Sequence, residues 1–171
     1  MRLFYAIWPD VAVQQALAER AHECQRTCGG RSIPAEKLHA TVAFLGEVTD
    51  ERYPSLLAIG GSLGASGCEL VLDELAYWRR SRVVYAAPSR IPATLSALAS
   101  TLGERLAGAG LCVEKHPFAP HVTLLRDAKR APRAVAFAPI TWRARALSLV
   151  ETLRRDGKHA YRTRASWTLA K

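Results

Sequence analysis

Two short segments of this 171-residue chain repeat one pattern at a separation of nearly half its length. His39–Val42 reads His-Ala-Thr-Val and His121–Leu124 reads His-Val-Thr-Leu, and the two histidines are 82 positions apart. Each segment opens an apolar stretch typical of a strand, and each follows a predicted helix and a proline-containing loop. Because helix, loop and strand recur in the same order, the pattern predicts two related lobes that each contribute one copy of the same device.

Capping residues, turn residues and apolar spacing predict a mixture of helices and strands along the rest of the chain. Hairpin turns are expected at 79–81 and at 154–158, where Asp-Gly is the strongest local turn signal. Hairpins imply antiparallel pairing, so the predicted fold class is α+β, with residues 1–171 forming a single two-lobed domain. Helices are predicted at about 11–28, 50–62 and 92–107, and strands at 2–8, 39–45, 68–78, 82–87, 111–114, 121–126, 141–153 and 160–169.

The excess of basic residues has two interpretations, a polyanionic partner or a compositional bias of the genome. Lys and Arg number 24 against 15 Asp and Glu, a formal net charge of +9, which would neutralise phosphates. Nineteen of the 24 basic residues are Arg, and alanine is abundant. A GC-rich genome produces the same bias in proteins of any function. No apolar run approaches the roughly 20 residues of a membrane span, and residues 1–10 do not resemble a signal peptide, so we expect a cytoplasmic protein.

The four cysteines favour a reducing compartment over a metal site. Cys24 and Cys28 share a face of the first predicted helix, but no second close pair completes a zinc site. We expect these two, with Cys68 and Cys112, to be buried free thiols.

Alternation along a strand gives each repeated segment a polar and an apolar face. His39, Thr41 and Ala43 are expected on one face, with Ala43 leaving room beside them, while Phe44 is expected in the core. In the second copy His121 and Thr123 share the polar face. Two such faces turned toward each other would form a cleft with two imidazoles and two hydroxyls.

Those four groups suit the splitting of a phosphodiester. One neutral imidazole can take a proton from water, an imidazolium can protonate the departing alkoxide, and hydroxyls can bond the non-bridging oxygens. Metal ligation is the alternative use of histidine, but His39 and His121 give only two ligands and no His-x-His or His-Glu-x-x-His spacing occurs. We therefore expect no metal and no cofactor.

The paired segments resemble the His-x-Thr signatures of the two-histidine phosphoesterases, and most closely those of the RNA 2′,3′-cyclic phosphodiesterases, also called 2′-5′ RNA ligases. The resemblance covers essentially the whole chain. It includes the opening strand Arg2–Ile7, the loops Pro34–Leu38 and Phe118–Pro120, and the last hairpin with Leu149–Thr152 and Tyr161. After Glu151 this chain reads Thr-Leu-Arg where the family usually has Ser-x-Leu, which bears on substrate contacts and not on the chemistry.

The resemblance implies a fold of two pseudo-symmetric lobes, with mainly antiparallel sheets flanking a water-filled cleft and helices outside. It implies metal-free hydrolysis of a 2′,3′-cyclic phosphate to a 2′-phosphomonoester, reversible as 2′-5′ ligation. By position, His39 would be the general acid that protonates the leaving O3′, and His121 the general base. Thr41 and Thr123 would hold phosphate oxygens. The implied partners are RNA with cyclic phosphate ends or nucleotide cyclic phosphates, bound by a monomer without a membrane.

Further residues are weaker candidates for binding. Arg126 matches an arginine often found after the second motif, but strict alternation places it opposite His121 unless the strand ends or bulges there. Tyr5 and Phe118 are candidates to stack on a base. Basic residues that could line an RNA path, or simply be solvated, are Arg126, Lys129, Arg130, Arg133, Arg154 and Arg155, and default surface or core-edge histidines are His22, His116 and His159.

Two other functions remain open from the sequence. The same chemistry could act on a small cyclic phosphate, such as a cyclic nucleotide or an ADP-ribose cyclic phosphate. A non-catalytic RNA-binding module could also keep the scaffold, although a pure binder needs no acid and base. Hydrolysis of a mononucleotide compared with an oligonucleotide separates the first alternative from RNA-end hydrolysis.

Overall fold

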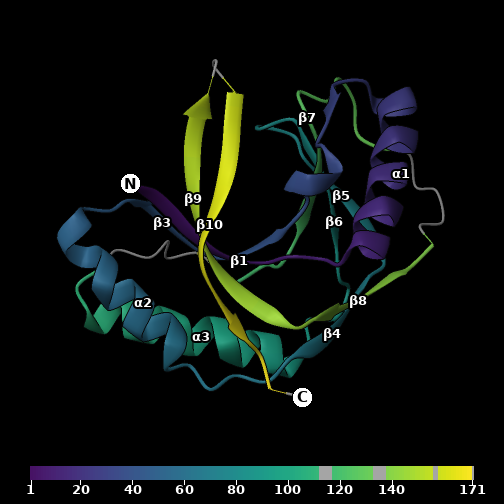
Figure 1. Cartoon of the computed structure of the whole chain (residues 1–171). Helices are drawn as coiled ribbons and strands as arrows, with labels where there is room; N and C mark the ends of the chain where they lie inside the picture. The colour runs from purple at the N-terminus through teal and green to yellow at the C-terminus, as the bar shows by residue number, and fades with distance from the viewer. Residues whose placement is uncertain (112–116, 133–137, 156–157, 171) are drawn as a thin grey trace.

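The computed structural model describes residues 1–111, 117–132, 138–155 and 158–170, and the side chains of 155 and 158 are outside that description. Figure 1 shows the elements in chain order. They are β1 (Arg2–Ile7), α1 (Val11–Cys28), β2 (Arg31–Ser32), β3 (Ala40–Glu47), α2 (Tyr53–Gly61), β4 (Cys68–Leu72), β5 (Glu74–Trp78), β6 (Val83–Ala87), α3 (Ala93–Gly108), β7 (Val122–Arg126), β8 (Ile140–Ala144), β9 (Ala146–Arg155) and β10 (Lys158–Thr168), with short 3₁₀ helices at Ala35–Lys37 and Asp50–Arg52.

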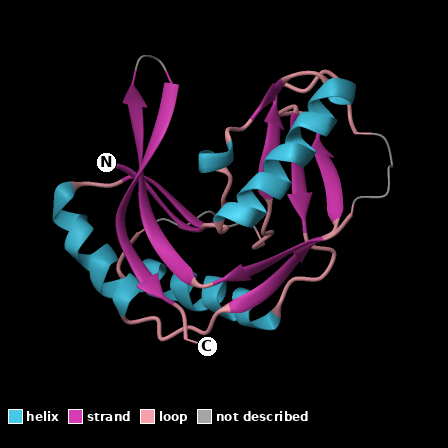
Figure 2. Ribbon diagram, turned by 45° about the vertical axis from the view of Figure 1, so that its right-hand side comes forward, coloured by secondary structure: helices cyan, strands magenta, loops and turns pink. Residues whose placement is uncertain are grey.

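One antiparallel sheet holds most of the strands, in the order β10-β9-β1-β3-β7-β6-β5, with β2 paired to β7. β4 and β8 form a separate two-stranded sheet. We call β1, β3, β9 and β10 with α2 and α3 the first lobe, and β2, β5, β6 and β7 with α1 the second lobe. Figure 2 shows the strands of the two lobes apart from one another, with helices on the outside of each. The predicted α+β class with mainly antiparallel sheets is confirmed.

The helices cross between the lobes. α1 lies between β1 and β3 in the sequence, yet it packs against β2 and β7, while α3 precedes β7 and packs against β3 and α2. The last turn of α1 is tied to the second lobe, since Lys129 N donates to Cys28 O at 2.9 Å. α1 and α3 therefore each cover the lobe to which the next motif strand, β3 or β7, does not belong.

Local chemistry accounts for the helix boundaries. The side chain of Asp10 accepts from Val13 N at 3.0 Å and caps α1, and Gly29 ends that helix with φ +68°. The predicted helices agree with α1, α2 and α3, except that 50–52 form a 3₁₀ turn before α2. Their buried faces repeat at helical spacing, with Leu95, Leu98, Leu102 and Leu106 on α3.

Two predicted strands are divided in the structure. The segment 68–78 breaks at Asp73, whose carboxylate accepts from Ser89 N at 2.7 Å and Ser89 Oγ at 2.6 Å. The chain then changes sheets, because β4 pairs with β8 while β5 pairs with β6. Similarly, 141–153 divides at Arg145, whose carbonyl accepts from Leu169 N. The predicted strand at 111–114 falls largely on residues outside the description, as do Asp156 and Gly157 of the last turn.

The described cysteines match their prediction: Cys24, Cys28 and Cys68 are free and buried, and Cys112 lies outside the described residues. No helix of the described chain combines the length and the hydropathy needed to cross a bilayer.

Gly30 offers a test of this packing. It has φ +86°, and an added Cβ would lie 2.6 Å from Arg126 O and 2.8 Å from Ala128 N. Gly30→Ala should therefore lower the free energy of unfolding by about 1–3 kcal/mol. The matched control is Gly103→Ala in α3, where nothing lies within 4 Å of the added Cβ. That change should raise stability by about 0.5–1 kcal/mol. Denaturant unfolding of both variants checks the pair, and equal effects would contradict the close approach at Gly30.

Candidate active site

The two repeated segments meet where the lobes join. β3 and β7 are antiparallel neighbours through a single registered pair, Ala40 with Val122, both buried. This register sets His39 across from Thr123, and Thr41 across from His121. The four predicted side chains therefore project from one face of the sheet at the lobe junction, which we call the motif face.

A register shift follows the first threonine and changes which side chains reach the motif face. Between Tyr5 and Ala6 of β1 the pairing with β3 slips by one residue, so Val42 is an extra residue in β3. Val42 and Ala43 are consequently both buried in the main core, and Phe44 packs on the other side with Phe4. One expectation from strict alternation is thus wrong: Ala43 is buried on the face opposite His39. Phe44 packs against a hydrophobic cluster as expected, but this is the smaller one that contains Phe4.

The second motif has an equivalent bulge. On β6, Val84 pairs with Leu125 while Tyr85 pairs with Thr123, which makes Leu124 an extra residue. Leu124 and Leu125 are both buried in the main core. The exposed Arg126 therefore returns to the face that carries His121 and Thr123. The sequence predicted that Arg126 would share a face with His121 only if the strand ended or bulged, and the structure has the bulge. Phe44 is at the equivalent position in the first copy, five residues after its histidine.

Both imidazoles are oriented by the same backbone contact. Nδ1 of His39 is 2.7 Å from Lys37 O, and Nδ1 of His121 is 2.8 Å from Ala119 O. A carbonyl oxygen can only accept, so each Nδ1 carries the proton and donates. Nε2 is then the nitrogen that each ring offers for proton transfer.

Aromatic rings surround His39. Its ring centroid lies 5.1 Å from that of Phe4, 4.8 Å from that of Trp8 and 5.2 Å from that of Tyr161. Phe4 and Tyr161 also meet edge to face at 5.4 Å. The rings hold the imidazole in place and remove water from part of its surface.

His121 has a smaller aromatic neighbourhood from the second lobe. The ring centroid of Trp78 lies 4.6 Å away and that of Tyr85 5.4 Å away, both at steep angles. The sequence analysis did not single out these two residues or the Phe4 and Trp8 that contact His39. Alternation in 2–8 predicts that Phe4 and Trp8 share a strand face. Their contact with His39 depends on which strand pairs with β1, and the local sequence does not show that pairing.

The surroundings lower the pKa of both histidines. Burial is the largest cause for each, and the hydrogen bond to the backbone carbonyl only partly offsets it. The positive charge of Arg126 lowers the pKa of both rings further, and His121 lowers that of His39. A bound phosphate anion would act in the opposite direction and favour protonation of an imidazole.

Arg126 has no acidic partner among the described residues. The neighbouring Asp127 is engaged elsewhere, with Oδ2 at 2.6 Å from Arg31 Nη2 and Oδ1 at 3.5 Å from Arg82 Nη2. These arginines hold the pKa of the Asp127 carboxyl below its usual range. The guanidinium of Arg126 therefore remains available to an anionic ligand.

The remaining candidates have other roles or stay untested. Tyr5 is fully buried and its hydroxyl donates to Leu56 O at 2.7 Å, so the prediction that it stacks on a base is wrong. Phe118 is half-buried against the main core. His22 and His159 are exposed, as expected, whereas His116 and Arg133 lie outside the described residues.

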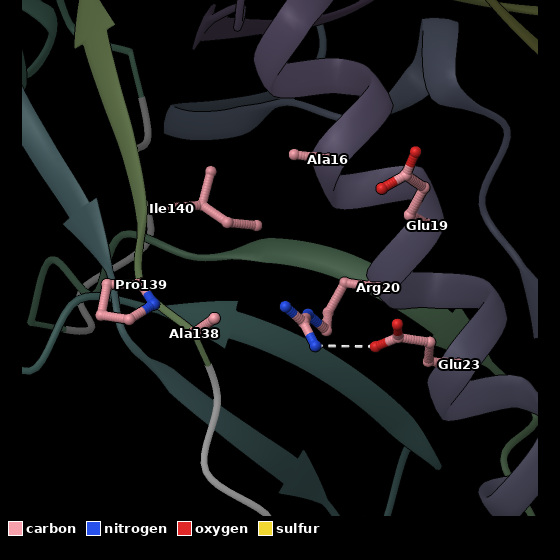
Figure 3. A pocket seen from close by; sticks show the side chains of 7 residues that line it. All are labelled: Ala16, Glu19, Arg20, Glu23, Ala138, Pro139 and Ile140. Atoms are coloured by element: carbon pink, nitrogen blue, oxygen red, sulfur yellow. Dashed lines mark hydrogen bonds and ion pairs between the residues drawn. The ribbon is translucent and has the colours of Figure 1, made fainter.

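Two cavities lie away from the histidines. One, of about 120 Å³, lies between α1 and the segment that leads into β8, and Figure 3 shows Arg20 and Glu23 paired on its wall at 2.7 Å. The other, of about 400 Å³, lies between β4 and the start of α3. Within the described part of the chain, no group of three or more His, Cys, Asp and Glu side chains is placed to hold a metal ion.

Comparison with known proteins shows the family of this chain. Residues 12–156 match the model of the 2′-5′ RNA ligase superfamily. The chain is 40% identical over 131 residues to the RNA 2′,3′-cyclic phosphodiesterase of Escherichia coli (strain K12), covering 76% of this chain and 74% of that protein. It is 32% identical over 168 residues to the protein of the same name from Thermus thermophilus, covering 89% and 82%.

Solved structures give the same result for the whole fold. E. coli LigT in its apo form superposes with a TM-score of 0.87 at 32% identity, over 99% of this chain and 98% of that one. The same protein with 3′-AMP gives 0.87 at 32% identity over the same coverage. The fold is that of the two-histidine phosphoesterases. This chain belongs to the 2′-5′ RNA ligase superfamily.

Arg126→Gln should raise the pKa of both His39 and His121, because it removes a positive charge that disfavours each imidazolium. NMR titration of the ring protons measures both values. Arg130→Gln is the matched control, since Arg130 is an exposed arginine four residues further on. Unchanged titrations in Arg126→Gln would show that Arg126 does not face the histidines.

Proposed function

We propose that this protein is an RNA 2′,3′-cyclic phosphodiesterase that opens cyclic phosphate ends to 2′-phosphomonoesters without a metal. The observation that carries the proposal is the pair of imidazoles on one face, each with Nδ1 bonded to a carbonyl. The E. coli and T. thermophilus relatives bear this activity in their names. The nucleotide-bound structures of E. coli LigT support a nucleotide ligand for this site as well.

The reaction needs one proton removed and one delivered. His121 Nε2 takes a proton from water as the water oxygen forms its bond to phosphorus. The bond from phosphorus to O3′ breaks, and His39 Nε2 gives its proton to O3′, leaving the phosphate on O2′. The two rings end in exchanged protonation states, which proton exchange with solvent resets. When the 5′-hydroxyl of a second RNA strand attacks in place of water, the same proton transfers form a 2′-5′ phosphodiester as O3′ leaves, which accounts for 2′-5′ ligation.

The lowered pKa values fit this division of labour. Burial lowers the pKa of His121, which favours the neutral form that acts as a base. His39 must be protonated to act as an acid, and the phosphate anion raises its pKa when the substrate binds. Thr41 and Thr123 donate to the non-bridging oxygens, and Arg126 supplies a positive charge to them.

Replacing either His39 or His121 by Ala should lower the rate of the chemical step by roughly 10²–10⁴-fold. The double variant should lose much less than the product of the two effects, because the groups act as a unit. His22→Ala on the exposed face of α1 is the control and should keep the wild-type rate. Thermal unfolding of each variant separates lost catalysis from lost folding.

A substrate with an activated aryl leaving group separates the two roles. Such a leaving group needs no proton, so His39→Ala should recover much of its rate while His121→Ala should not. Recovery by His121→Ala instead would reverse the assignment of acid and base. Wild-type rates in both variants with the cyclic phosphate would contradict the proposed function.

A further inference from the structure

The proposed roles of the two histidines determine on which side the nucleoside lies. In an in-line displacement, the attacking water and the leaving O3′ are on opposite sides of phosphorus. The ribose carries both O2′ and O3′, so it lies on the side of the acid, His39, and the water lies on the side of His121. We propose that the RNA strand preceding the cyclic phosphate leaves the site over the first lobe, along the motif face of β1, β9 and β10. This inference rests on the proposed function.

Strand register continues the motif face from His39 toward the end of the β9–β10 hairpin. Tyr161, which contacts His39, pairs with Thr152, and Thr152 also pairs with Arg2 on β1. Arg154 is two residues beyond Thr152 on β9, with no register shift between them. Arg2, Thr152, Tyr161 and Arg154 therefore share one face. A ring, a hydroxyl and two guanidinium groups in a row suit a single-stranded polynucleotide, because rings can stack on bases and cations can bind phosphates.

The hairpin extends beyond the sheet. The pairing of β1 with β9 ends at Arg2 and Thr152, whereas β9 and β10 remain paired to Arg155 and Lys158. Figure 1 shows this two-stranded arm projecting above the rest of the first lobe. Lys37, whose carbonyl accepts from His39, donates from Nζ to His159 O on the arm at 2.8 Å. The same residue thus connects His39 to the arm and adds a third cation at His159.

Charge differs between the two faces of these strands. The carboxylate of Glu151 points to the opposite face, where its Oε2 is 4.0 Å from Arg162 Nη1 and 3.3 Å from Arg164 Nη1. On the motif face, neither Arg2 nor Arg154 has an acidic partner among the described residues, and the guanidinium of Arg2 lies 5.1 Å from the centroid of the Phe44 ring. Glu47 is the cross-strand neighbour of Arg2, whereas Arg154 is paired with His159, so the cation on the arm has no carboxylate opposite it.

The second lobe offers less to a polyanion at the equivalent place. Arg31 and Arg82, near the end of β7, are both occupied by Asp127. Arg79 and Arg80 in the turn after Trp78 are exposed and provide the competing exit for the strand. The two exits can be compared directly by removing one charge from each.

The experiment compares two substrates in three variants. The substrates are adenosine 2′,3′-cyclic phosphate and a short RNA oligonucleotide that ends in a 2′,3′-cyclic phosphate. The variants are Arg154→Ala on the arm, Arg80→Ala on the second lobe and Arg162→Ala as the matched control. Arg162 is on the same hairpin as Arg154, but it belongs to the opposite face with Glu151. For each, kcat and KM are measured over a range of salt concentrations.

Arg154→Ala should lower kcat/KM for the oligonucleotide by about 3- to 10-fold, through KM, and leave the mononucleotide value near wild type. The log–log salt dependence of oligonucleotide binding should become shallower by about 0.7, the contribution of one phosphate contact on a single strand. Arg162→Ala and Arg80→Ala should leave kcat/KM for both substrates at the wild-type value.

The inference would be overturned if Arg154→Ala and Arg162→Ala had the same kcat/KM for the oligonucleotide. An oligonucleotide-specific loss in Arg80→Ala would also overturn it, because that result would place the strand on the second lobe. Failure of the proposed function would look different, because the wild-type protein would then open neither substrate. Circular dichroism shows whether each variant folds as the wild type does, so that a change in kcat/KM can be assigned to RNA binding and not to misfolding.

Discussion

The short antiparallel contact between β3 and β7 is the constraint on which the site depends. One registered pair, Ala40 with Val122, joins the lobes and sets each histidine across from the threonine of the other copy. Both alanine and valine are buried there, so the polar residues on either side of them are directed to the opposite face. The crossed packing of α1 and α3 supports this contact, because each helix covers the lobe to which the following motif strand does not belong. Each lobe carries only one of the two histidines.

The bulge after each threonine brings a different residue to the motif face in each half of the chain. Without the extra residues Val42 and Leu124, the fifth residue after each histidine would point into the core. With them, Phe44 reaches the motif face on the first lobe and Arg126 reaches it on the second. The first lobe thus adds a ring at this position and the second lobe adds a cation, which lowers the pKa of both histidines. A symmetric scaffold therefore presents an asymmetric site, which a reaction with distinct attacking and leaving groups needs.

Much of this could be predicted from the sequence, because the information was local or repeated. Helix α1 was predicted from Asp10 and Gly29 at its ends, and the four side chains of the motifs from the doubling of His-x-Thr. Strict alternation failed at Ala43, since a bulge depends on the register with a neighbouring strand and carries no mark in the sequence of its own strand. The same reason explains why the sequence does not indicate Trp78 as a neighbour of His121, and why alternation predicts one strand over 68–78 although Asp73 turns toward Ser89. Long-range pairing, not local preference, decides these features.

The central claim is that two oriented imidazoles open a cyclic phosphate by attack of water on the side opposite O3′. The most direct measurement is incubation of the purified protein with RNA ending in a 2′,3′-cyclic phosphate, in ¹⁸O-labelled water and excess chelator. Phosphorus NMR and mass spectrometry then identify the product. The account predicts a 2′-phosphomonoester that carries one labelled oxygen, formed at the same rate with and without chelator. A 3′-phosphomonoester, or a reaction that stops on chelation and resumes when zinc is added, would contradict it.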